Sequence, residues 1–94
     1  MGDHRAKRKS TAAENLDYYR RNTCLVAEST RRGKLLSREK AAEKIGVGPR
    51  TIRSWEDGDR GLEVAELIVM AESYGEDPVA MFTRITQGKK ANRS

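Results

Sequence analysis

The chain has 94 residues, a formal net charge of +5 from 19 basic and 14 acidic side chains, and a hydrophobic fraction of 36%. This length suits one small domain, and an apolar fraction below the roughly 45–50% of average soluble domains predicts a small core. The chain lacks both the roughly 20 consecutive apolar residues of a membrane helix and an apolar run behind its basic start, so we expect no membrane partner and no secretory signal.

Charge is distributed unevenly along the chain. Residues 1–10 carry a net +3, residues 11–55 a net +5, residues 56–87 a net −6 and residues 88–94 a net +3. Residues 1–10 lack apolar periodicity and are expected to form a flexible basic arm, while residues 88–94 are expected to form a basic C-terminal tail. The arm either lies along DNA and contacts it, or serves only to keep the chain in solution. Its candidate DNA contacts are Arg5, Lys7, Arg8 and Lys9.

Capping signals predict the first two helices. Thr11 followed by Glu14 is a capping-box pattern, so a helix is expected to begin there and to run to about Arg32. Ser37 is the expected N-cap of a second helix, which ends at Gly46, a residue suited to a left-handed turn. The residues expected to face inward from these helices are Leu16, Tyr19, Thr23, Val26, Ala27, Thr30, Leu36, Ala41, Ala42 and Ile45.

Three more helices follow. Pro49 is expected at the first position of the third helix, the fourth is expected from about Glu63 to Ser73, and Asp77 is the expected N-cap of the fifth. Because no segment alternates as a strand would, the sequence predicts an all-α, compact five-helix domain over residues 11–87. The residues expected to face inward are Ile52, Trp55, Val64, Leu67, Ile68, Met70, Ala71, Tyr74, Val79, Phe82 and Ile85, with Met81 beside them.

The chain offers little for metal or covalent chemistry. Cys24 is its only cysteine and His4 its only histidine. A zinc cluster needs several Cys or His ligands, and no nucleophile and base can be paired around His4. We therefore expect no metal, no cofactor and no enzymatic activity, and a reducing, cytoplasmic compartment.

Residues 37–57 have the spacing of a helix-turn-helix. Gly46 can adopt the left-handed turn, and the small Ala42 lets the two helices cross closely. Ile52 fills the angle between the helices, and Trp55 anchors the second one to the core. The outer face of that second helix is then free to enter a major groove.

The segment also resembles the lambda-repressor-like (XRE, Cro/CI) helix-turn-helix family over residues 31–78. The resemblance rests on Leu36-Ser37, Ala42, Gly46-Val47, Thr51-Ile52, Trp55-Glu56-x-Gly58 and Leu67…Ala71…Gly75. It implies DNA base contacts from Arg50, Arg53 and Ser54, phosphate contacts from Arg38 and Thr51, and a structural ion pair between Arg31 and Glu56. Outside such a motif, Arg50 and Arg53 would instead be interpreted as charged side chains on an exposed helix face that contact only solvent.

The resemblance implies a prokaryotic or phage transcriptional regulator, repressor-like, that binds a double-stranded DNA operator in a sequence-specific way. It is expected to act as a homodimer in the cytoplasm, associated with the nucleoid. The alternative is an antitoxin or protein-bridging module of the same fold. In that case the acidic face of residues 56–87 would bind a protein partner.

Overall fold

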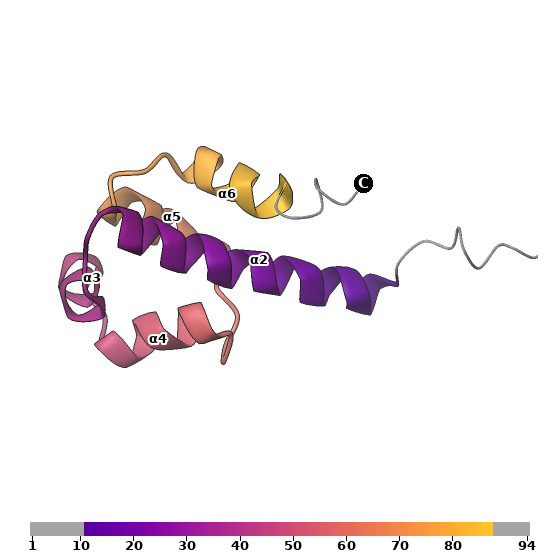
Figure 1. Cartoon of the computed structure of the whole chain (residues 1–94), viewed down its shortest axis with the longest axis horizontal. Coiled ribbons are helices and arrows are strands. Elements are labelled where there is room, and N and C mark those ends of the chain that lie inside the picture. Colours follow the sequence, from indigo (N-terminus) through magenta and orange to yellow (C-terminus); the bar gives the residue numbers. More distant parts are fainter. Residues whose placement is uncertain (1–10, 88–94) are drawn as a thin grey trace, which may run out of the picture.

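The computed structural model describes residues 11–87, which form five helices joined by short turns. Figure 1 shows α2 running the length of the domain, with α4 on one side of it and α6 on the other. The helices are α2 (Ala12–Gly33), α3 (Arg38–Ile45), α4 (Pro49–Asp57), α5 (Val64–Ser73) and α6 (Pro78–Gln87). The predicted all-α, five-helix domain is confirmed for these residues.

Side-chain caps set the starts of α2 and α3. The Glu14 amide donates to Thr11 Oγ1 at 3.1 Å and the Thr11 amide donates to Glu14 Oε1 at 2.9 Å, which is the reciprocal pattern of a capping box. At α3, Ser37 Oγ accepts from the Lys40 amide at 3.1 Å. Both helices therefore begin where the local sequence predicts, because the caps satisfy amides that have no partner inside the helix.

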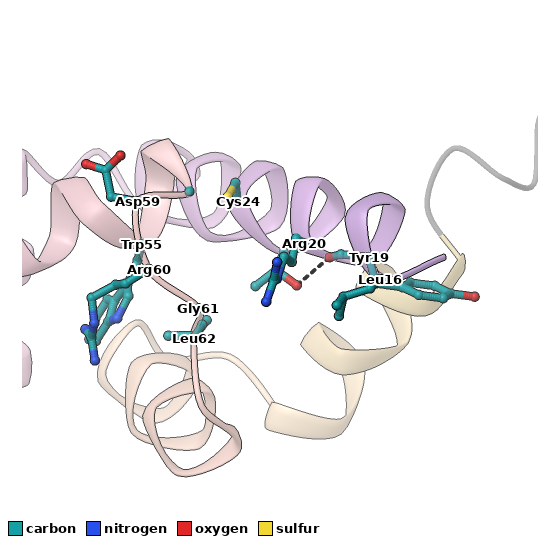
Figure 2. Close-up of a pocket in the computed structure, with 11 residues that line it drawn as sticks. Leu16, Tyr19, Arg20, Cys24, Trp55, Asp59, Arg60, Gly61 and Leu62 are labelled. Carbon is teal, nitrogen blue, oxygen red and sulfur yellow. Dashed lines mark hydrogen bonds between the residues drawn. The ribbon is translucent and has the colours of Figure 1, made fainter. Parts of the chain in front are cut away.

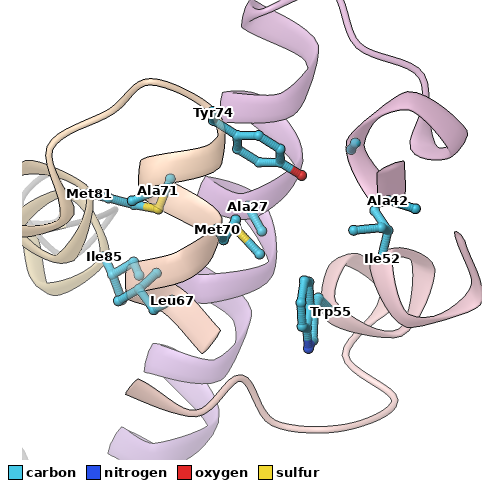
Figure 3. Packing of buried hydrophobic residues seen from close by; sticks show 11 residues of the cluster. Ala27, Ala42, Ile52, Trp55, Leu67, Met70, Ala71, Tyr74, Met81 and Ile85 are labelled. Atoms are coloured by element: carbon cyan, nitrogen blue, oxygen red, sulfur yellow. The ribbon is translucent and has the colours of Figure 1, made fainter. Parts of the chain in front are cut away.

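The core collects apolar side chains from all five helices. Figure 3 shows Ile52 and Trp55 of α4 on one side of the cluster and Met81 and Ile85 of α6 on the other, with α5 between them. Burial of each large side chain contributes about 1.5–3 kcal/mol. The buried apolar residues are Ala27, Ala41, Ala42, Ile52, Trp55, Leu67, Met70, Ala71, Tyr74, Met81 and Ile85.

On α6 the structure corrects the predicted inner face. Val79 and Phe82, which were expected to be buried, are 70% and 53% exposed, whereas Met81 and Ile85 are buried. Both stripes have helical spacing, so the pattern alone does not distinguish them. Packing selects the Met81–Ile85 stripe, and the buried Asn22 side chain of α2 donates from Nδ2 to the Ile85 carbonyl at 2.9 Å.

Three further expected core residues are also exposed. Val64 and Ile68 lie on the outer face of α5, because that helix is apolar on nearly every side and only one stripe can face the core. Leu16 is exposed, like every other residue from 11 to 17 at the start of α2. The core is therefore smaller than the sequence pattern predicts.

The start of α5 gives the domain a pH-dependent contact. The Glu66 carboxylate accepts from the Glu63 amide at 3.0 Å and from Arg60 Nη2 at 2.8 Å. The backbone hydrogen bond from Glu63, reinforced by Arg60, holds the pKa of Glu66 below its ordinary value of 4.5. The folded state therefore binds the Glu66 proton less readily than the unfolded state does.

This stabilisation is present above pH 4.5 and is lost as the pH falls through the lower folded pKa. In thermal melts recorded from neutral to acidic pH, Glu66→Gln should be less stable than wild type at neutral pH. Its melting temperature should also fall less steeply below pH 4.5. Glu72→Gln, at an exposed position of the same helix, is the matched control. If the melting temperatures of wild type and Glu66→Gln fell equally as the pH was lowered, the lowered pKa of Glu66 would be contradicted.

Candidate nucleic-acid interface

The geometry of the α3–α4 unit depends on one left-handed residue. Gly46 has φ 91°, a conformation that disfavours side chains, and it ends α3. The Gly46 and Val47 amides both donate to the Ala42 carbonyl, at 2.7 and 3.1 Å. α4 then begins at Pro49, whose missing N–H costs nothing at the first helical position. The predicted turn between the two helices is confirmed.

α4 is anchored on one side and free on the other. Ile52, Trp55 and Glu56 are buried. Arg50 and Arg53 are exposed, and within residues 11–87 neither guanidinium has an ion-pair or hydrogen-bond partner. They lie three residues apart, about 4.5 Å along the helix axis. Two unneutralised guanidinium groups thus project from one turn of a rigid helix.

The other two predicted contacts on α4 are half-buried. Thr51 and Ser54 lie between the exposed arginines and the core side of the helix. The Ser54 carbonyl accepts from the amides of Gly58 and Asp59, which closes the C-terminal end of α4. Thr51 and Ser54 therefore lie at the border of the exposed face and are less accessible than Arg50 and Arg53.

The Arg31–Glu56 ion pair ties α2 to the end of α4. Arg31 Nε donates to Glu56 Oε2 at 2.6 Å and Arg31 Nη2 donates to Oε1 at 2.9 Å, while Nη1 donates to the Leu36 carbonyl at 2.8 Å. The hydrogen bonds to Glu56 raise the pKa of Arg31, so the guanidinium stays charged. Burial raises the pKa of neighbouring Tyr74 to about 12, and the Glu56 charge adds to that shift, so the phenol stays neutral.

Arg38 makes a contact with Glu56 that the sequence did not indicate. Its Nε donates to Glu56 Oε1 at 3.1 Å, so the buried carboxylate joins three helices. Arg38 and Glu56 are 18 positions apart, and no local pattern signals such a contact. The residue predicted to bind phosphate is thereby also part of the buried ion-pair network.

These side chains surround a recess of about 530 Å³ between the starts of α3 and α4. The recess is lined by Arg31, Arg38, Glu39, Pro49, Arg50 and Arg53. Its positive lining and its position next to the exposed face of α4 suit the phosphate backbone of a nucleic acid. The predicted DNA-binding arm, with Arg5, Lys7, Arg8 and Lys9, lies outside the described residues.

A second pocket, of about 470 Å³, lies between α2 and the connection from α4 to α5. Figure 2 shows Arg60 beside Trp55 at one side of it; the guanidinium carbon is 5.9 Å from the ring centroid. Cys24 also lines this pocket, and burial, with a further contribution from Asp57, raises the pKa of its thiol. The thiol is therefore not activated as a nucleophile, since reactive cysteines have a lowered pKa.

Two further observations concern the part of the chain from 11 to 87. No three or more His, Cys, Asp or Glu side chains within it are placed to hold a metal ion. None of its helices is both long enough and apolar enough to span a membrane.

Comparison with known proteins identifies the unit built by these helices. A helix-turn-helix family model matches residues 29–80, which include α3, α4 and α5 and the ion pair that holds them to α2. The chain belongs to the lambda-repressor-like helix-turn-helix family. No curated protein and no solved structure matches the chain. As a lambda-repressor-like helix-turn-helix domain, it is a DNA-binding module.

Proposed function

We propose that this chain is a sequence-specific regulator of transcription that inserts α4 into the major groove of an operator. The observation that carries the proposal is the pair of exposed, unneutralised guanidinium groups of Arg50 and Arg53 on the anchored α4. Each can donate two hydrogen bonds to O6 and N7 of a guanine, the commonest base-specific contact. Ser54 is proposed as a further base contact, and Thr51 and Arg38 as phosphate contacts. The chain would act on nucleoid DNA in the cytoplasm.

The test is selection of bound duplexes from a random pool at moderate salt. A sequence-specific regulator should enrich one motif containing G·C pairs at fixed positions, because each bidentate arginine discriminates by about 1–3 kcal/mol. Binding without enrichment, even after repeated rounds, would mean that only the phosphate backbone is contacted. That result would exclude the proposed function.

We further propose that the regulator binds as a homodimer. Val64, Ile68, Val79 and Phe82 are exposed apolar residues of α5 and α6, and α6 lies on the opposite side of α2 from α4 (Figure 1). Association through these side chains would bury apolar surface without covering the recognition helix. The enriched motif is then expected to be an inverted repeat.

Phe82→Glu should make the protein monomeric by placing a charge in this apolar surface. Loss of the second half-site contact should weaken binding to the inverted repeat by at least about a hundredfold. Analytical ultracentrifugation and titration of a labelled duplex measure the two effects. Leu25→Glu, at an exposed apolar position of α2, is the matched control. A Phe82→Glu protein that remains a dimer would refute this interface.

A second function is favoured by the acidic surface. Residues 56–87 carry a net charge of −6, and Asp59, Glu63 and Glu72 are exposed. An antitoxin or bridging protein would use such a surface to bind a basic protein partner. In that case the chain should co-purify with a partner protein in a 1:1 ratio, and substitution of Arg50 should leave that complex intact.

A further inference from the structure

The carboxylate of Glu56 holds two guanidinium groups at once. Its Oε1 accepts both from Arg31 Nη2 at 2.9 Å and from Arg38 Nε at 3.1 Å, and its Oε2 accepts from Arg31 Nε at 2.6 Å. Only 1% of the Glu56 side chain is exposed, so this carboxylate cannot itself contact DNA. Any effect of Glu56 on DNA binding must pass through one of its partners.

The two arginines differ in how much hydrogen-bonding capacity remains. Arg31 uses Nε, Nη1 and Nη2 inside the protein, and its side chain is 10% exposed. Arg38 uses only Nε among residues 11–87, and its side chain is 33% exposed. A guanidinium held through Nε still presents its two terminal Nη groups, which match two phosphate oxygens. Arg38 is therefore the partner that can bind a second anion.

The position of Arg38 suits a backbone phosphate. It is the first residue of α3, and it lines the same recess as Arg50 and Arg53 of the recognition helix. A duplex whose bases are reached by the two α4 arginines therefore brings its backbone to this recess. Arg50 and Arg53 line the recess from the exposed face of α4, whereas Arg38 lines it from the start of α3. Arg38 therefore lies beside that face, as expected for a contact that positions the protein without reading sequence.

We propose that Glu56 is a positioning residue, which holds the Arg38 guanidinium through Nε so that its two Nη groups bind one DNA phosphate. The inference rests on the proposed DNA-binding function and adds a role for a residue that does not touch DNA. A free arginine side chain samples many rotamers, and ordering it on binding opposes association. Here the side chain is ordered when the domain folds, so the phosphate meets a preorganised donor pair.

Arg38→Lys provides the sharpest test, because it retains the charge and leaves the Arg31–Glu56 contacts in place. An ammonium group cannot donate to Glu56 in the Nε geometry and also bind a phosphate bidentately. Arg38→Lys should therefore weaken binding to the selected duplex about fivefold, and Arg38→Gln about tenfold. Arg38→Gln should also lower the slope of log affinity against log salt by about one.

The matched control is Lys40→Gln. Lys40 is a basic residue of the same helix that pairs with Glu43 at 3.7 Å, and it lies roughly 200° around the helix from Arg38. We expect this variant to bind within about twofold of wild type. Thermal melts of all variants exclude loss of folding as the cause of weak binding.

A double-mutant cycle tests the role of Glu56 itself. Glu56→Gln should weaken binding about threefold in the wild-type background but less than about 1.5-fold in the Arg38→Gln background, because the positioned group is then already absent. Equal effects in the two backgrounds, or wild-type affinity for Arg38→Lys, would overturn the positioning role while leaving the proposed function intact. Wild-type protein that binds no duplex at all would overturn both.

Discussion

Replacing Arg31 with methionine should lower the free energy of unfolding by about 3–5 kcal/mol, because it leaves a buried carboxylate without its main partner. Arg31 makes two of the three side-chain hydrogen bonds that reach Glu56, and only 1% of the Glu56 side chain is exposed. Arg38 then has to neutralise this charge alone, through a single 3.1 Å contact. Urea denaturation followed by the fluorescence of Trp55, the only tryptophan, measures the loss.

The control for this prediction removes both charges. A buried ion pair often contributes no more than apolar residues of similar size, so Arg31→Met combined with Glu56→Leu should recover most of the lost stability. Recovery would show that the damage comes from an unpaired buried charge and not from lost packing around α2. A single Arg31→Met variant that loses less than about 1 kcal/mol would mean that Glu56 is better solvated than the structure indicates.

Substitution of either Arg50 or Arg53 by alanine should reduce affinity for the selected operator by about 1–3 kcal/mol, roughly 5- to 150-fold. Both side chains are exposed on α4, so their removal should leave the melting temperature nearly unchanged. Each variant should also lose the preference for one base pair, and the two positions should differ. Repeating the selection from a random pool with each variant measures that change directly.

Affinity for an unrelated duplex separates base recognition from general electrostatics. Arg50→Ala and Arg53→Ala should weaken nonspecific binding far less than operator binding, because a nonspecific duplex offers no matched guanine edges. Lys40→Ala, on α3, removes one charge without a predicted base contact and serves as the reference. Equal losses on the operator and on the unrelated duplex would show that the two arginines contact only phosphate.

The helix boundaries could be predicted because their signals are local. Thr11 with Glu14, and Ser37, cap amides within one turn, and Pro49 has no amide that needs a cap. A short window of sequence therefore contains the whole cause. The left-handed turn at Gly46 is equally local. The Arg31–Glu56 pair was anticipated only through the family resemblance, since its partners are 25 positions apart.

Local sequence signals are sufficient to predict the five helices, the turn that makes a helix-turn-helix, and the exposure of Arg50 and Arg53 opposite the apolar side of α4. The exposure of Phe82 and the burial of Met81 depend instead on contacts between helices, because α6 carries two apolar stripes and the packing of its neighbours selects one. The same holds for the contact between Arg38 and Glu56. Arg38 and Glu56 belong to different helices and meet only when those helices pack. The buried Glu56 carboxylate then accepts a hydrogen bond from Arg38, because a buried charge is costly without partners.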